Sequence, residues 1–393
     1  MLQPQSPSSF KMAPVAALAP AVPPALTTCK SISASPSIAS LVRNTKSSIA
    51  SRQPLQVSGL LDSLYEFDEL TPGLGRLYPT IQLRDLIYHE KADELIRDLA
   101  IIISRRGVVF FKNQELSADE QKFVTDRLGH LTGKPATSGL HIHPVYNAER
   151  VGKDQVVDEK GTQNKDNEIS VISSNLHRSL DVEPRSGADE WHSDIAFEPV
   201  PADYTSLKVH TLPQTGGDTM WARGYEVYDL LSQPFRNMFE KLKGFYYPPE
   251  FINSAARHGY ALYPGPRGAA ENVDTHLTAE HPLIRTNPVT GWKSVFGIGH
   301  HFNRILGVSL DESDMLKRYI RDLVTQNHST QLRYRWGKND LAIWDNRSTY
   351  HAATPDYFDL GPRSGIRAVS CGERPFFDPA SRSRREELKG KLV

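Results

Sequence analysis

Residues 191–232 read WHSDIAFEPVPADYTSLKVHTLPQTGGDTMWARGYEVYDLLS. The stretch contains two short runs, TSLKVHTL and DTMW, whose apolar and β-branched residues are typical of strands, with a Gly-Gly pair between them that is typical of a turn. An H-x-D triplet, formed by His192 and Asp194, precedes the first run. Side chains two residues apart in an extended segment point to the same side. The stretch therefore predicts a β structure that presents an imidazole and a carboxylate together.

A second histidine of interest is His351, which stands far downstream in WDNRSTYHAATPD. Two imidazoles and one carboxylate are the ligand set of non-heme Fe(II) sites that keep coordination positions open. Arg363 and Arg367 follow closely, and an arginine there can hold an acidic co-substrate. We interpret this order as that of an oxygen-activating iron enzyme. The same three ligands can bind catalytic zinc, so a zinc hydrolase is the alternative at the level of the metal.

The composition bounds the class of protein and its partners. The chain has 46 Lys plus Arg, 46 Asp plus Glu and 39% hydrophobic residues, as in an ordinary globular protein without net charge. This balance offers no basic surface for nucleic acid or for an anionic membrane, so we expect neither as a partner. Only two cysteines are present, which indicates a reducing compartment, and we expect a cytoplasmic location. A homo-oligomer is left open.

The chain divides into three parts by composition. Residues 1–62 are rich in Ser, Ala and Pro and hold a single acidic residue, Asp62; we expect a disordered or targeting N-terminal extension, the latter making a mitochondrial location the alternative. The longest apolar run in it is broken by prolines and is too short to span a bilayer. Residues 63–380 are expected to form one domain, with residues 149–189 as a long polar loop that could act as a lid, and residues 381–393 as a C-terminal tail.

Helices and strands are expected to alternate irregularly along this domain. Helical periodicity over residues 93–106 ends at Gly107, and the strand-like run VVFF follows it. Capping boxes at Ser117 and Ser309 each predict the start of a helix, the first of which should end at Gly129. Further strand-like runs are LAIWD and IRAVS. The pattern favours a mostly β fold with flanking helices, of the sandwich or jelly-roll type.

Three blocks of sequence occur in the order of a known family. They are HIHPVY, the stretch from residue 191 quoted above, and RYRWGKNDLAIWDNRSTYHAATPDY with the following GPRSGIRAVSCGERPF. On these blocks the chain resembles the taurine and 2,4-dichlorophenoxyacetate dioxygenase family of Fe(II)/2-oxoglutarate enzymes over residues 65–378. The resemblance implies a double-stranded β-helix (jelly-roll) core, Fe(II), and 2-oxoglutarate and O2 as co-substrates.

The resemblance also assigns residues to the metal and the co-substrate. It implies that His192, Asp194 and His351 hold the iron. Thr219, from GGDT, and Arg363, the first arginine of R-x-x-x-R, should bind the distal carboxylate of 2-oxoglutarate.

The substrate site implied by the resemblance is an anion pocket. Its members are His143, the backbone amide of Ile195, and Arg367. One guanidinium, one imidazole and one N–H suit a three-oxygen sulfonate. We therefore expect a small anionic substrate, first of all an alkylsulfonate that is hydroxylated next to sulfur and releases sulfite and an aldehyde.

The chain departs from the taurine enzymes at the other end of the pocket. Ala188 stands where they carry an asparagine near the substrate amine, and the pair His300-His301 replaces small or acidic residues. Taurine itself is therefore not expected as the preferred substrate. The alternatives are the same oxidation of a carboxylate or a secondary-metabolite intermediate and, in a different class, a jelly-roll binding protein without catalysis.

Overall fold

The computed structural model describes residues 54–145, 166–174, 186–357 and 359–389. They lie in one compact unit of the chain, which is the unit considered below. Among the described residues, no helix combines the length and the apolar character needed to cross a membrane.

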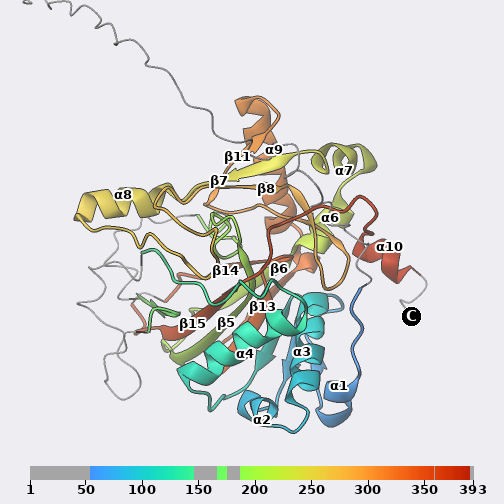
Figure 1. Cartoon of the computed structure of the whole chain (residues 1–393), viewed down its shortest axis with the longest axis vertical. Helices are drawn as coiled ribbons and strands as arrows, with labels where there is room; N and C mark the ends of the chain where they lie inside the picture. Colours follow the sequence, from blue (N-terminus) through green and yellow to red (C-terminus); the bar gives the residue numbers. More distant parts are fainter. Residues whose placement is uncertain (1–53, 146–165, 175–185, 358, 390–393) are drawn as a thin grey trace, which may run out of the picture. The chain divides into compact units, whose positions relative to one another are not determined.

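Two sheets, antiparallel except for one pair of strands, form the centre of this unit (Figure 1). The larger has seven strands in the order β1 (Asp68–Glu69), β2 (Arg76–Tyr78), β3 (Val108–Phe111), β13 (Asp340–Asp345), β5 (Ala202–Thr211), β15 (Ser364–Cys371) and β4 (Ile169–Ser173), with one parallel pair, β2 and β3. The smaller has the order β12 (Gln331–Tyr334), β6 (Thr219–Arg223) and β14 (Thr349–Ala353). Strand runs far apart in the sequence thus become neighbours.

An aromatic core joins the two sheets. Trp221 of β6 lies with its ring centroid 5.1 Å from that of Phe110 in β3 and 6.0 Å from that of Trp344 in β13. All three side chains are at most 1% exposed. Burial of such large apolar surfaces is the main force that holds one sheet against the other.

Helices α3 (Ala92–Arg106) and α4 (Ala118–Leu131) lie beside the larger sheet and contact β13, β5 and β15 (Figure 1). The predicted stop at Gly107 and the capping box at Ser117 are both confirmed. The stop expected at Gly129 is wrong by two residues, because the Thr132 hydroxyl donates to the carbonyl of Leu128 and supports one more turn. A short helix, α2 (Leu83–Ile87), precedes α3.

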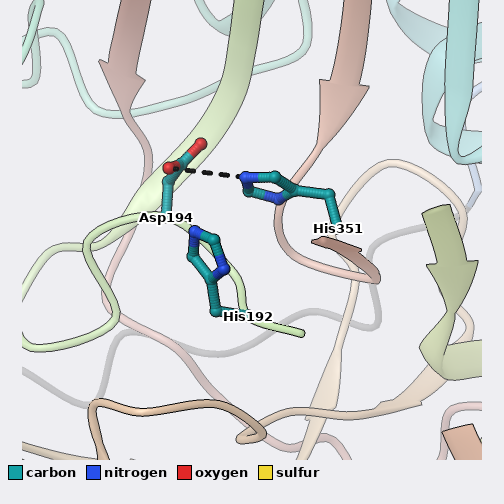
Figure 2. Close-up of side chains that lie close together, drawn as sticks. All are labelled: His192, Asp194 and His351. Carbon is teal, nitrogen blue, oxygen red and sulfur yellow. Dashed lines mark ion pairs between the residues drawn. The ribbon is translucent and has the colours of Figure 1, made fainter. Parts of the chain in front are cut away.

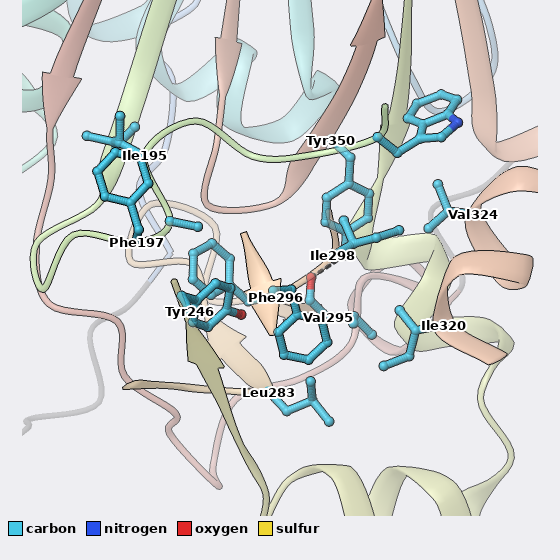
Figure 3. Packing of buried hydrophobic residues seen from close by; sticks show 14 of the residues in the cluster. Ile195, Phe197, Tyr246, Leu283, Val295, Phe296, Ile298, Ile320, Val324 and Tyr350 are labelled. Atoms are coloured by element: carbon cyan, nitrogen blue, oxygen red, sulfur yellow. Dashed lines mark hydrogen bonds between the residues drawn. The ribbon is translucent and has the colours of Figure 1, made fainter. Parts of the chain in front are cut away.

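A second hydrophobic cluster lies beyond the smaller sheet (Figure 3). It is enclosed by the strands β7 (Lys243–Tyr246), β8 (Ala279–Pro282), β9 (Ile284–Thr286), β10 (Lys293–Val295) and β11 (Phe302–Leu306), and by the helices α6 (Gly224–Leu230), α7 (Gln233–Phe239), α8 (Pro249–His258) and α9 (Leu310–Thr325). Its central residues include Tyr350, whose hydroxyl donates to the carbonyl of Val295. The capping box predicted at Ser309 opens α9.

The fold class agrees with the expectation in part. Several sheets with flanking helices are present, but α3 with 15 residues and α9 with 16 are longer than any strand, so the unit is a mixed α/β fold rather than mostly β. The reason is that the segments between the strand runs carry amphipathic, well-capped helices that cover the sheets.

The structure differs from the expected domain division at the start of the folded unit, in the segment 149–189 and at the C-terminus. The folded unit begins before residue 63: Leu61 in α1 (Leu60–Leu64) is fully buried, and Ser58 bonds to the carboxylate of Asp98. The segment 149–189 is not one loop, because it contains β4, which pairs with β15. Of this segment only residues 166–174 and 186–189 are described, so the predicted lid lies largely outside the described residues. Residues 1–53 also lie outside them.

The C-terminal segment expected as a tail also folds in part. Helix α10 (Arg384–Leu388) begins with a capping box at Ser383, and Ser383 is fully buried. The backbone of Arg385 donates to the carboxylate of Asp229 in α6. These contacts make residues 381–389 a part of the unit rather than a tail.

Candidate metal centre

The sequence-predicted ligands meet because a short backbone bridge joins their segments. His192 and His351 pair as antiparallel neighbours, with N–O distances of 3.0 and 2.9 Å, and their ring centroids lie 4.2 Å apart. Asp194 follows two residues later, and its Oδ1 is 3.9 Å from His351 Nε2 (Figure 2). One potential ligand atom from each of the three residues lies within 4.8 Å of the other two.

The protonation states suit metal binding. His192 Nδ1 lies 2.7 Å from the carbonyl oxygen of Glu190, which can only accept, so Nδ1 carries the hydrogen and Nε2 keeps its lone pair. Burial, and then the neighbouring His351, hold the pKa of His192 well below its usual range. Burial also lowers the pKa of His351. Both imidazoles are therefore neutral at physiological pH, as metal coordination requires.

Asp194 is held as an ionised carboxylate. Burial alone would raise the pKa of Asp194, but the positive charge of Arg367 is the largest of the influences that lower it, to about 2. Its Oδ2 accepts from the Thr205 hydroxyl at 2.9 Å. Two neutral imidazoles and one ionised carboxylate in this arrangement fit an Fe(II) ion with open positions.

Two residues that orient Asp194 were not found in the sequence analysis. Asn346 accepts a hydrogen bond from the backbone N–H of Asp194 at 3.0 Å and donates to Thr205 Oγ1 at 2.8 Å. Thr205 in turn holds the carboxylate. Such partners of metal ligands fix their orientation. The only sequence signal for them was their position inside the two quoted blocks.

Arg363 and Thr219, predicted for the co-substrate, are brought together. Arg363 is 5% exposed; its Nε donates to the carbonyl of Gly217 at 2.8 Å, and its Nη2 lies 3.5 Å from Thr219 Oγ1. Burial lowers the pKa of Arg363, although its side chain stays cationic at any physiological pH. Trp336, which the sequence analysis missed, donates from Nε1 to Thr219 Oγ1 at 3.0 Å. The result is a buried cation with a hydroxyl beside it.

Arg367 and His143 were predicted to bind the substrate anion, and of the two Arg367 contacts Asp194 directly. Arg367 Nη1 donates to Asp194 Oδ1 at 2.7 Å. His143 Nδ1 accepts from the backbone N–H of Val145 at 3.2 Å, which leaves Nε2 as a donor. Burial, and then the charge of Arg367, hold the pKa of His143 well below its usual range, so His143 is a neutral donor.

Ile195, the third predicted member, has an unusual backbone. Its φ is 45°, in the left-handed region that β-branched residues rarely adopt. Strain of this kind persists only where the surroundings enforce it, and it often marks a site next to functional groups. Here it occurs directly after Asp194.

Ala188, by contrast, lies on the wall of a pocket of about 570 Å³ that His300 and Gly299 also line. The His300 ring is in contact with the ring of His192, at 4.9 Å between centroids. The pocket therefore borders the metal centre.

Comparison with known proteins identifies related sequences and folds. A family model described as "Taurine catabolism dioxygenase TauD, TfdA family" matches residues 66–369. The chain is 41% identical over 339 residues to the alpha-ketoglutarate-dependent dioxygenase oryG of Aspergillus oryzae, covering 86% of this chain and 96% of that protein. It is 29% identical over 316 residues to an alpha-ketoglutarate-dependent sulfonate dioxygenase of Saccharomyces cerevisiae, covering 79% and 68%.

A solved structure supports the fold. The crystal structure of a taurine dioxygenase from Burkholderia xenovorans aligns with a TM-score of 0.58 at 24% identity, covering 81% of this chain and 92% of that one.

Proposed function

The chain belongs to the TauD, TfdA family of alpha-ketoglutarate-dependent dioxygenases, and from this premise we propose that it hydroxylates a small organic acid whose anionic group is a carboxylate. As a member of this family the protein depends on Fe(II) and 2-oxoglutarate.

One observation carries the proposal of an anionic substrate. Arg367 Nε is buried and has no hydrogen-bond acceptor among the described residues, although Nη1 of the same guanidinium holds Asp194. A buried donor without a partner costs roughly 1–3 kcal/mol, more when it is charged. A ligand carboxylate placed against this edge of the guanidinium would satisfy it, because the two-oxygen carboxylate matches the planar arginine fork.

The relatives weaken the case for a sulfonate. A relative at 41% identity has a name that specifies no sulfonate, whereas two relatives named as sulfonate dioxygenases, one of them as putative, are 31% and 29% identical. The expected alkylsulfonate therefore becomes the second candidate. It is favoured by the presence of His143, which the resemblance assigns to the substrate anion, as a buried and neutral imidazole. A secondary-metabolite acid fits the first candidate.

Each group of residues has a distinct part in the reaction. His192, Asp194 and His351 would hold Fe(II), which with O2 and 2-oxoglutarate supplies the oxidising chemistry. Arg363 and Thr219 would bind the distal carboxylate of 2-oxoglutarate and fix its orientation. Arg367 and His143 would hold the substrate anion beside Asp194, so that the carbon to be oxidised lies near the metal.

We also infer that the larger and the smaller sheet are the two walls of a double-stranded β-helix. The aromatic core between them supports this, as does the bridge by which His192 pairs with His351 in the middle of β14 and brings Asp194 close to it. The resemblance to the family likewise implies a double-stranded β-helix core.

Matched pairs of substrates test the proposal. Butane-1-sulfonate and pentanoate have the same chain with different head groups, and taurine and β-alanine form a second pair. Succinate and sulfite are measured with each compound, and with Arg367→Ala as a control. We expect succinate formation to be stimulated more by the carboxylate of each pair. Sulfite formed one-for-one with succinate, and faster than any carboxylate turnover, would favour the alkylsulfonate instead.

A further inference from the structure

A second cluster of metal-binding side chains lies outside the groups used above. It consists of Glu250 in α8 and of His300 and His301, which lie in the turn directly before β11. One ligand atom from each lies within 4.8 Å of the others. No residue is shared with the first triad. The cluster has two imidazoles and one carboxylate, as the first triad does.

The distances within the cluster match those between ligands of one ion. Glu250 Oε1 lies 3.1 Å from His301 Nδ1 and 3.6 Å from His300 Nε2. In a tetrahedral site with bonds of about 2.0–2.1 Å, neighbouring ligand atoms are roughly 3.3 Å apart. His301 Nδ1 is buried and makes no hydrogen bond to a described group in spite of its short distance to the carboxylate. The contact therefore lacks the direction of a hydrogen bond.

The surroundings of the cluster are partly enclosed and aromatic. The side chains of Glu250, His300 and His301 are 22%, 15% and 7% exposed. The His301 ring packs with its edge or face against Phe197 and Phe251, at centroid distances of 5.1 and 5.3 Å. An apolar shell that limits the access of water is typical of the surroundings of protein-bound metal ions.

We propose that Glu250, His300 and His301 form a second site for a divalent transition-metal ion, of the Zn²⁺ class. The nitrogen-rich donor set suits such an ion better than Mg²⁺ or Ca²⁺, which prefer oxygen ligands. This proposal does not depend on the identity of the substrate.

The ion would fasten helix α8 to the wall of the metal centre. No residue of α8 is fully buried, so the helix is held by partly buried contacts such as those of Phe251. Phe251 lies against His143, and His300 lies against His192. An ion bound by both segments would thus fix one segment that contacts His143 and another that contacts His192.

Counting bound ions tests the proposal without any assay of activity. The full-length protein is stripped with a chelator and equilibrated with excess Zn²⁺, unbound ion is removed, and the metal per chain is measured. We expect two ions in the wild type, one in Asp194→Ala, one in His301→Ala and none in the double variant. Glu250→Gln, which keeps the shape of the side chain, should also retain one.

Controls separate this result from unfolding and from surface binding. His276→Ala removes an exposed histidine and should leave two ions bound. Far-UV circular dichroism of each variant reports its fold, and Glu250→Gln provides the test if His301→Ala does not fold. Two ions retained in Glu250→Gln or His301→Ala would overturn the proposal. So would a single ion in the wild type that Asp194→Ala abolishes.

Discussion

Arg367 contacts the carboxylate of Asp194, a candidate metal ligand, with one nitrogen, and its buried Nε has no acceptor within the described part of the chain. Its charge is the largest influence that keeps Asp194 ionised in a buried position. The same guanidinium is thus suited to support the metal ligand and to bind the substrate anion. Arg363 has a different environment, with the Gly217 carbonyl and the Thr219 hydroxyl as its neighbours.

The two arginines should separate in kinetics. Arg363→Ala should raise the KM for 2-oxoglutarate, and Arg367→Ala should weaken substrate use while slow, substrate-independent decay of 2-oxoglutarate continues. Each lost charge-assisted contact should cost about 1.5–3 kcal/mol, roughly ten- to a hundredfold in affinity. Steady-state assays with each compound varied in turn measure both effects.

Arg333→Ala serves as the control for charge, because Arg333 is 51% exposed and pairs with Asp218 and Asp356. It should leave both KM values within about twofold, as expected for an exposed ion pair. If the two buried arginines show the opposite pattern, their assigned roles are exchanged.

Thr205 should influence metal affinity although it is not a ligand. Thr205→Val keeps the shape of the side chain but removes the hydrogen bond to Asp194 Oδ2 and the acceptor of Asn346. We expect metal affinity to fall about ten- to a hundredfold. Anaerobic Fe(II) titration with 2-oxoglutarate, followed by visible absorption, measures it. Thr211→Val, at the other end of the same strand, should bind the metal like the wild type; an equal loss there would point to a general effect on β5.

At the scale of elements, the loop before β11 packs directly on the segment of His192. Gly299 has a φ of 111°, and a Cβ at this position would lie 2.7 Å from the Cβ of His192 and 2.8 Å from the carbonyl oxygen of Trp191. These partners are a backbone atom and the base of a ligand side chain, which cannot move away easily. A glycine is therefore required here for close approach.

Gly299→Ala should displace His192 and lower metal affinity by about tenfold or more, while the rest of the unit stays folded. The same Fe(II) titration measures the affinity, and circular dichroism measures the fold. Gly259→Ala is the matched control, since Gly259 also has a positive φ, 67°, but its Cβ would meet nothing within 4 Å. Equal metal affinity in the two variants would contradict the packing argument.

At the scale of the whole molecule, the fold keeps several histidines buried and neutral. Burial lowers the pKa of five of them: His141, His143, His192, His281 and His351. In the unfolded chain each would take up a proton near pH 6.5. Below that pH the unfolded state binds more protons than the folded state, so acidification should destabilise the metal-free protein. Asp203, whose pKa burial raises to about 6, opposes this for one proton.

The stability of the metal-free protein should therefore fall as the pH decreases from about 6.5. Each such histidine contributes about 1.4 kcal/mol per pH unit in this range. His281, with its pKa lowered to about 3 by burial, is the clearest case. His281→Gln should make the slope of the free energy of unfolding against pH shallower by the amount that corresponds to nearly one proton. Urea denaturation at several pH values measures this slope. An unchanged slope, or the same change in the exposed His276→Gln, would show that burial of His281 is not the cause.

Local chemistry explains which parts of this protein could be predicted from the sequence. The capping boxes at Ser117 and Ser309 and the helix stop at Gly107 depend on neighbours within a few residues. The strand runs follow from residue type and alternation. The three candidate ligands stood out by residue type and order, and the sequence blocks around them indicated the family, which the match over residues 66–369 confirms.

Only the tertiary structure decided which groups surround those ligands. The bond between Asp194 and Asn346 joins residues 152 positions apart, and that between Trp336 and Thr219 joins residues 117 apart. The Arg367 contact to Asp194, and the meeting of Glu250 with His301, likewise depend on how strands and helices pack. No local period or cap encodes such contacts, because their partners are chosen by the burial of whole elements. The sequence by itself thus determined the types of the candidate ligands and the family, and the packing of distant strands determined the charges and hydrogen bonds around the candidate metal centre.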